Sequence, residues 1–230
     1  MEVIILAGGF GRRLKNHIPS IPKPMAPINN RPFLDYILNY LNNYDIDKII
    51  FSLFHKHQVI QKYYQYDYEG IEISYSIDKG PLGTGGAIKE ALSFADNEHI
   101  FVINGDTFFN VNLLDLYKKH IEDCNDITFS LKPMKNFDRY GIIKTSESGN
   151  VISLSEKEYS RSGQIDGGIY LIKRILFDDY NGEKVFSFND YIINNLKYIK
   201  VGSMVFDEIF IDIGIPEDYK SAQKLLRDQI

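Results

Sequence analysis

The sequence predicts an α/β fold with a Rossmann-like, mixed but mainly parallel sheet covered by helices on both faces, and a small β-rich lobe. The first half of the chain alternates short apolar runs with segments of helical periodicity, which is typical of parallel strands joined by helices. The second half lines up short apolar runs separated by turn residues such as 147–150, which predicts the lobe. With 230 residues and no internal repeat, the chain fits a single domain.

Each element of the first half follows from its own apolar pattern. Strands are expected at 3–6, 48–53, 71–77 and 99–103. Helices are expected at 32–43, 55–66, 85–95 and 113–122. In the first of these helices, Phe33, Ile37 and Leu41 fall on one face. Ligands of such sheets bind beyond the carboxyl ends of the strands, so the loops after the first, third and fourth strands are the informative ones.

In the second half, strands are expected at 127–131, 141–145, 151–154 and 167–172. A helix at about 188–196, a strand at about 208–213 and a closing helix from Pro216 complete the chain. No Pro- or Ser-rich linker separates the halves. We therefore expect one domain over 1–230, built from halves of about 1–125 and 126–230.

Composition excludes several classes of function. A net charge of -5 argues against a nucleic-acid-binding face, so an anionic ligand must be held locally by a few basic groups and backbone amides. The single cysteine, Cys124, forms no internal disulfide and suits a reducing compartment. The apolar run at the N-terminus is too short for a signal peptide, and no stretch reaches the length of a membrane span. We expect a cytoplasmic protein without nucleic-acid or membrane partners. The oligomeric state stays open, with a homo-oligomer among the alternatives.

A glycine cluster follows the first expected strand, in the segment Leu6–Leu14 (LAGGFGRRL). Glycines allow the backbone to approach a phosphate and direct N–H groups at it, and the two arginines add positive charge. The spacing G-G-x-G differs from the dinucleotide fingerprint G-x-G-x-x-G. By itself the cluster also fits an ordinary tight turn. The five histidines show no metal-ligand spacing and are expected at the surface or at helix ends.

The next motif, Pro22-Lys23-Pro24-Met25, presents one lysine from a loop stiffened by two prolines. Alone, it would be interpreted as a solvated lysine in a braced loop. Together with the glycine cluster it resembles the sugar-phosphate nucleotidyltransferase family, whose signature is G-G-x-G-x-R-L followed closely by P-K-P-[ML].

The resemblance extends over about residues 3–220 in the order of the family's motifs. The matching segments are Pro81–Ala87 (PLGTGGA), Asn104-Gly105-Asp106, Glu156-Lys157, Asp166–Tyr170 (DGGIY) and Phe210–Tyr219 (FIDIGIPEDY). This resemblance implies the nucleotide-diphospho-sugar transferase fold, with a nucleotide-binding first half and a sugar-binding second half. It also implies transfer of a nucleotide from an NTP to a sugar 1-phosphate, with Mg²⁺ as cofactor and release of pyrophosphate.

The resemblance assigns a role to each matching position. The implied catalytic residues are Arg13, Lys23 and Asp106, and the implied metal ligands are Asp106 and Asp212. The implied nucleotide-binding residues are Leu6, Ala7, Gly8, Gly9, Gly11, Arg12, Gly83, Thr84 and Gly105. The implied sugar-phosphate-binding residues are Gly141, Glu156, Lys157, Asp166 and Gly168.

Within the family, the segments 18–27, 31–34 and 80–88 look most similar to D-glycero-α-D-manno-heptose 1-phosphate guanylyltransferases. These enzymes make GDP-heptose for bacterial surface glycans such as capsule or lipopolysaccharide, so the resemblance implies GTP and a heptose 1-phosphate as substrates. Several departures from the family's pattern bear on substrate identity, among them the absence of P-L-T after R-L and Glu158 in place of a proline. Arg12 stands where relatives often have threonine, Asp166 where asparagine is frequent, and Phe210 where they have tryptophan.

Other functions stay open at this point. A mannose-1-phosphate guanylyltransferase and a hexose-1-phosphate uridylyl- or thymidylyltransferase share the same motifs. A noncatalytic regulatory subunit on this fold would often lack one of the charged residues that this chain keeps, namely Arg13, Lys23, Asp106 and Asp212. An oxidoreductase would need the dinucleotide spacing that is missing here.

Overall fold

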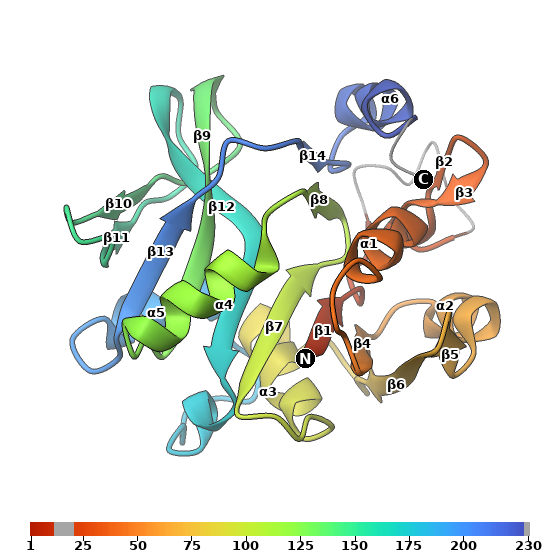
Figure 1. Ribbon diagram of the computed structural model, residues 1–230, viewed down its shortest axis with the longest axis horizontal. Helices are drawn as coiled ribbons and strands as arrows, with labels where there is room; N and C mark the ends of the chain where they lie inside the picture. The colour runs from red at the N-terminus through yellow and green to blue at the C-terminus, as the bar shows by residue number, and fades with distance from the viewer. Residues whose placement is uncertain (12–20, 228–230) are drawn as a thin grey trace.

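The computed structural model describes residues 1–11 and 21–227. Its centre is an eight-stranded mixed sheet in the order β13-β9-β12-β7-β1-β4-β6-β5 (Figure 1). Its strands are β1 (Glu2–Leu6), β4 (Lys48–Leu53), β5 (Asp67–Tyr68), β6 (Ile71–Ile77), β7 (His99–Asn104), β9 (Ile127–Phe137), β12 (Ser160–Lys173) and β13 (Val201–Val205). Strands β7, β1, β4 and β6 are mutually parallel. The first half thus forms the parallel core that the sequence predicts.

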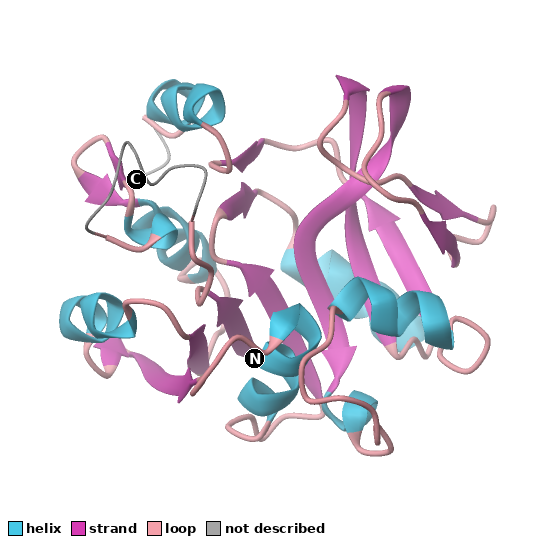
Figure 2. Ribbon diagram, turned by 180° about the vertical axis from the view of Figure 1, so that it is seen from behind, coloured by secondary structure: helices cyan, strands magenta, loops and turns pink. Residues whose placement is uncertain are grey.

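Helices cover both faces of the sheet, as predicted (Figures 1 and 2). They are α1 (Phe33–Leu41), α2 (His57–Tyr64), α3 (Gly83–Leu92), α4 (Leu113–Glu122), α5 (Phe188–Asn195) and α6 (Pro216–Leu225). Alternate residues of each central strand face opposite sides, so Val3 and Ile5 pack with α1, α2 and α4, whereas Ile4 packs with α3 and α5. The sheet therefore lies between two apolar cores.

The second half extends this sheet. Strand β12 runs antiparallel to both β7 and β9, and β13 adds parallel to β9 at the edge. The segments expected at 127–131 and 167–172 are the parts of β9 and β12 inside the sheet, and the remaining parts of these long strands project beyond it. The projecting ends lie beside the hairpin of β10 (Ile143–Thr145) and β11 (Val151–Leu154). This region forms the expected β-rich lobe.

Two further short strand pairs lie outside the main sheet, and one of them connects distant segments of the chain. Strand β8 (Thr107–Phe109) pairs with β14 (Phe210–Asp212) and joins the two halves of the chain. Strand β2 (Pro27–Ile28) pairs with β3 (Arg31–Pro32), just after the 3-10 helix η2 (Lys23–Met25). A second 3-10 helix, η3 (Arg174–Phe177), follows β12. Among residues 1–11 and 21–227, no helix is long and apolar enough to cross a membrane.

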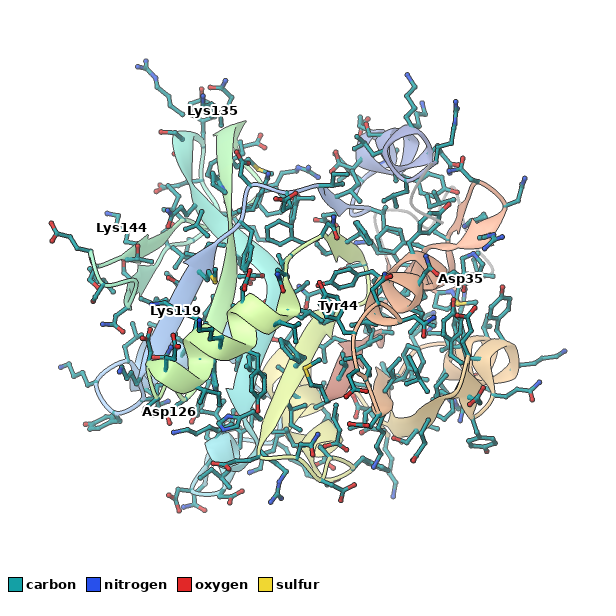
Figure 3. The ribbon with its side chains drawn as sticks, in the orientation of Figure 1. Asp35, Tyr44, Lys119, Asp126, Lys135 and Lys144 are labelled. Carbon is teal, nitrogen blue, oxygen red and sulfur yellow. The ribbon has the colours of Figure 1, made fainter. Side chains whose placement is uncertain are left out.

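One histidine lies at a helix end, as expected, but is buried there and not exposed. His120 on α4 is fully buried, with its Nδ1 2.8 Å from Thr128 Oγ1 and its Nε2 3.0 Å from His99 Nδ1. Burial lowers the pKa of His120 to about 4, and the neighbouring His99 and Lys173 act in the same direction. Asp126 opposes this effect, but it is itself paired with Lys173 at 2.8 Å (Figure 3).

This buried imidazole predicts a loss of stability in mild acid. The pKa of His120 is lower in the folded state than in the unfolded chain, so the unfolded state binds more protons as the pH falls from 6.5 toward 4. We expect the free energy of unfolding, measured in urea, to fall by about 2 kcal/mol between pH 7.5 and pH 5 through this group. His120→Gln, which takes up no proton, should show a smaller fall; equal falls in both proteins would contradict the prediction.

Candidate active site

A cavity of about 530 Å³ opens at the carboxyl ends of β1, β4, β6 and β7, where the sequence predicts the site. Its lining includes these predicted residues: Leu6, Ala7, Gly8, Gly9, Gly11, Lys23, Gly83, Thr84 and Asp106. The structure therefore brings together the glycine loop after β1, the lysine of η2, the loop before α3 and the aspartate after β7. Gly105 lies just behind this wall, where its N–H donates to the Leu6 carbonyl at 2.9 Å.

The glycine loop after β1 packs closely against its neighbours. Gly11 has φ +59°, a left-handed conformation that favours glycine, and a Cβ there would lie 3.1 Å from Lys23 Cβ. The loop and the lysine are therefore fitted to each other. The predicted residues Arg12 and Arg13 lie outside the described residues.

The second glycine loop packs on the segment before α5. Gly83 has φ +70°, and a Cβ there would collide with the Phe186 carbonyl, whereas one at Gly85 would enter the Phe186 ring. The Gly85 N–H donates to the Phe186 carbonyl at 3.0 Å, and Thr84 Oγ1 accepts from the Phe188 N–H at 2.9 Å. Glycine at these positions thus has a structural cause, close packing against residues 186–188, in addition to any contact with a ligand.

Three charged groups form the centre of the site. The ammonium of Lys23 lies 2.6 Å from Asp106 Oδ2 and 3.3 Å from Asp212 Oδ1, so one lysine joins both carboxylates. The Lys23 and Asp212 side chains are mostly buried, whereas Asp106 is 39% exposed. In such a setting, charge-assisted hydrogen bonds are stronger than at the open surface.

The backbone brings these carboxylates together from distant parts of the chain. Asp212 pairs with Thr107 in the β8–β14 ladder, and the Ile213 N–H donates to the Asp106 carbonyl at 3.1 Å. Gly214 leaves room for the Asp212 carboxylate, because a Cβ there would lie 2.9 Å from Asp212 Oδ1. The short β14 strand thus determines where the second carboxylate points.

Asp166 and Gly168, two of the residues predicted to bind the sugar phosphate, lie in β12 beside this centre. Asp166 accepts hydrogen bonds from the Tyr170 hydroxyl at 2.5 Å and from the Gly168 N–H at 2.8 Å. Burial raises the pKa of Asp166, and these two hydrogen bonds oppose that effect. Gly168 packs against the side chain of Asn104, which lines the cavity. Asp166 therefore connects to the cavity wall through Gly168 and Asn104.

The other three residues predicted to bind the sugar phosphate lie farther from the cavity. Glu156 and Lys157 are exposed in the segment between β11 and β12, and in the described part of the chain neither side chain has a hydrogen bond or an ion pair. Gly141 packs against the carbonyl of Ser155, next to this pair. The structure thus places Gly141, Glu156 and Lys157 together, but not in the wall of the cavity.

Asp78 and Tyr140 are among the residues of the site that were not predicted from the sequence. Asp78, directly after β6, lines the cavity, and burial together with the negative charge of Glu90 raises its pKa to about 6. Its position at the carboxyl end of a strand is a signal that could have identified it. Tyr140 donates from its hydroxyl to Asp212 Oδ2 at 3.2 Å, a contact for which the sequence carries no signal.

The fold and this centre define a nucleotide-binding α/β protein with a lysine held between two carboxylates. The sequence profile of nucleotidyl transferases matches residues 2–229. The chain belongs to this family of enzymes, which confirms the family predicted from the motifs.

Two curated relatives and one solved structure show where the chain lies in the family. The chain is 47% identical over 219 residues to D-glycero-alpha-D-manno-heptose 1-phosphate guanylyltransferase of Campylobacter jejuni, covering 95% of this chain and 97% of that protein. It is 46% identical to the protein of the same name from Aneurinibacillus thermoaerophilus, over 100% of both chains. The crystal structure of HddC from Yersinia pseudotuberculosis complexed with GMP-PN has a TM-score of 0.82 at 35% identity, covering 97% of this chain and 98% of that chain.

Proposed function

We propose that the protein transfers the guanylyl group of GTP to D-glycero-α-D-manno-heptose 1-phosphate, forming GDP-heptose and pyrophosphate. The observation that carries the reaction class is the lysine held between two carboxylates at the rim of a glycine-lined cavity. The substrate pair rests on the likeness to the two heptose 1-phosphate guanylyltransferases.

In this reaction an oxygen of the sugar phosphate forms a bond to the α-phosphorus of GTP. The bond from that phosphorus to the α–β bridging oxygen breaks, and its electron pair leaves with pyrophosphate. A phosphate monoester, whose second pKa is about 6, is already an anion at neutral pH, so no general base is required. The protein must instead bring two polyanions together and stabilise the charge on the transferring group.

Lys23 supplies one of the positive charges for this task. Its ammonium lies at the cavity wall on a loop held by Pro22 and Pro24, and the hydrogen bond from the Met25 N–H to the Pro22 carbonyl, 2.9 Å long, fixes the turn. A lysine placed in this way neutralises the α-phosphate region without a large rearrangement of the chain. Arg13 is proposed to bind the β- and γ-phosphates.

Asp106 and Asp212 fit a magnesium site, because their carboxylates already share one cation, the Lys23 ammonium. In the described part of the chain no group of three or more His, Cys, Asp or Glu residues is placed to hold a metal ion. Phosphate oxygens and water would therefore complete the coordination. When bound, Mg²⁺ would neutralise charge between the α-phosphate and the sugar phosphate.

The remaining predicted roles are retained as part of this proposal. The two glycine loops bind the nucleotide, and Asp78 offers acceptor oxygens that fit the N1–H and exocyclic amine of guanine. Gly141, Glu156, Lys157, Asp166 and Gly168 bind the sugar phosphate, so the first half of the single domain binds the nucleotide and the second half the sugar. The free thiol of Cys124 suits the cytoplasm as the place of the reaction.

The test measures pyrophosphate release while GTP, UTP, dTTP, CTP and ATP are each combined with several sugar 1-phosphates. Mannose 1-phosphate and D-glycero-α-D-manno-heptose 1-phosphate are both included, with Mg²⁺ or with EDTA. We expect turnover with GTP and the heptose, and its loss in EDTA. Turnover with another pair would keep the reaction and overturn the substrates. Folded protein without turnover on any pair would indicate a noncatalytic nucleotide-binding subunit.

A further inference from the structure

Both oxygens of the Asp212 carboxylate have protein partners. Oδ1 accepts from Lys23 at 3.3 Å, and Oδ2 accepts from the Tyr140 hydroxyl at 3.2 Å. A carboxylate rotates readily about the bond that joins it to Cβ, because this sp³–sp² torsion is broad. Two partners on opposite oxygens restrict that rotation, whereas Lys23 alone would leave the second oxygen without a fixed direction.

Tyr140 is itself held firmly in the segment between β9 and β10. Its ring lies edge-on to Phe210, two residues before Asp212 in β14, with ring centroids 6.2 Å apart and planes at 74°. The guanidinium of Arg139 lies over the same ring at 5.4 Å and forms an ion pair of 2.5 Å with Asp218 in the first turn of α6. The segment is therefore fixed on both sides of Asp212.

The Tyr140 hydroxyl is the donor in its contact with Asp212. Its O–H is directed at Asp212 Oδ2, 3.2 Å away, and an ionised carboxylate oxygen can only accept a hydrogen bond.

The same segment leads directly to the proposed binding site of the sugar phosphate. Gly141 packs against the Ser155 carbonyl, and the Ile142 N–H donates to Ser155 Oγ at 2.9 Å. Ser155 precedes Glu156 and Lys157, which are proposed to bind the sugar and its phosphate. Tyr140 therefore lies between the proposed acceptor segment and the second carboxylate.

We propose that Tyr140 is a positioning residue, whose hydroxyl holds the Asp212 carboxylate so that Oδ1 faces Asp106 and is available to the divalent cation. The inference rests on the proposed function. Outer partners of metal ligands commonly contribute 10- to 100-fold to metal affinity or activity, because they fix the ligand's orientation. Binding of the acceptor near Gly141 and formation of the metal site would then depend on the same short segment.

The test is Tyr140→Phe, which removes the hydroxyl and keeps the ring against Phe210. Dissociation constants for GTP are measured by calorimetry, without acceptor, once with Mg²⁺ and once with EDTA. We expect the constant in EDTA to be unchanged and the constant with Mg²⁺ to rise about 10-fold. With both substrates present, kcat of Tyr140→Phe should fall about 10-fold. In a double-mutant cycle, adding Tyr140→Phe to Asp212→Asn should cause little further loss of kcat.

The matched control is Tyr44→Phe. The Tyr44 hydroxyl, in the connection after α1, donates to the Val111 carbonyl at 3.0 Å, outside the cavity lining (Figure 3). This variant should keep both constants and kcat.

If wild-type protein turns over with Mg²⁺ and Tyr140→Phe behaves like the control, the inference is wrong. If Tyr140→Phe weakens GTP equally in EDTA, the hydroxyl supports the fold rather than the carboxylate, and the inference is also wrong. If wild-type protein shows neither turnover nor an effect of Mg²⁺ on GTP binding, the proposed function fails together with the inference.

Discussion

Asp106→Asn is expected to lower kcat by about a thousand-fold while the protein stays folded. Asparagine has nearly the same shape as aspartate and still offers an oxygen to Lys23, which lies 2.6 Å away in the wild-type protein. What it loses is the negative charge that a magnesium site requires. Because the Asp106 side chain is 39% exposed, and because Lys23 keeps Asp212 as a partner, we expect little change in the thermal unfolding midpoint.

Asp207→Asn is the control for this experiment. Asp207 is likewise paired with a lysine, Lys132 at 2.7 Å, but this pair does not line the cavity, and Asp207 is 81% exposed. Its variant should turn over at the wild-type rate. Near-normal turnover in Asp106→Asn would show that this carboxylate is not part of the reaction centre, even if the substrates of the reaction were as proposed.

The parallel core was predictable from sequence because β1, β4 and β7 contain short apolar runs, and β6 alternates apolar and polar residues. Strand β4, for example, was expected at its observed bounds. Strand β13 was not predicted, since Gly202 and Ser203 interrupt its apolar residues, and its pairing with β9 is a contact between distant segments. The full length of β12 was also missed. Its exposed first part, 160–164, has no apolar pattern and is extended by pairing with β9.

The site was predictable where a residue type and its loop carry the chemistry. Lys23, Asp106 and Asp212 were identified from motifs, and the structure brings both carboxylates within hydrogen-bond distance of the Lys23 ammonium. Tyr140 was not identified, because its role depends on the direction of one hydroxyl. The close packing of Gly83 and Gly85 on Phe186 could not be predicted from the sequence either, since Phe186 lies about a hundred residues away in the chain. Motifs thus identify residues that meet at the cavity, whereas the orientation of their side chains depends on long-range packing.

Lys23→Met is expected to have the second large effect, a fall in kcat/KM of about a hundred- to a thousand-fold. Methionine keeps most of the buried stem of the lysine but removes the ammonium that lies between Asp106 and Asp212. The α-phosphate then loses a positive charge that reaches it without a large rearrangement of the chain. The loss should appear for every nucleoside triphosphate, because the lysine is proposed to contact phosphate and not the base.

The same substitution separates the lysine's two roles, because it acts in opposite directions on activity and on metal binding. In the wild-type protein the ammonium lies between the two carboxylates, where a divalent cation would bind, and so competes with Mg²⁺ when no nucleotide is present to draw the lysine away. Lys23→Met leaves two carboxylates facing each other without a counter-charge. Mg²⁺ alone should therefore raise the thermal unfolding midpoint of this variant by several degrees and that of wild-type protein by much less.

Lys132→Met, which removes the mostly buried lysine partner of the exposed Asp207, should respond to Mg²⁺ as wild-type protein does. Equal responses in wild-type protein and Lys23→Met would mean that the ammonium does not compete for the metal position. A larger response confined to Lys23→Met, together with its loss of turnover, would mean that one lysine neutralises the empty metal site and then the bound triphosphate. The charge that holds the two carboxylates together in the free protein would then be the charge that GTP draws away when Mg²⁺ enters.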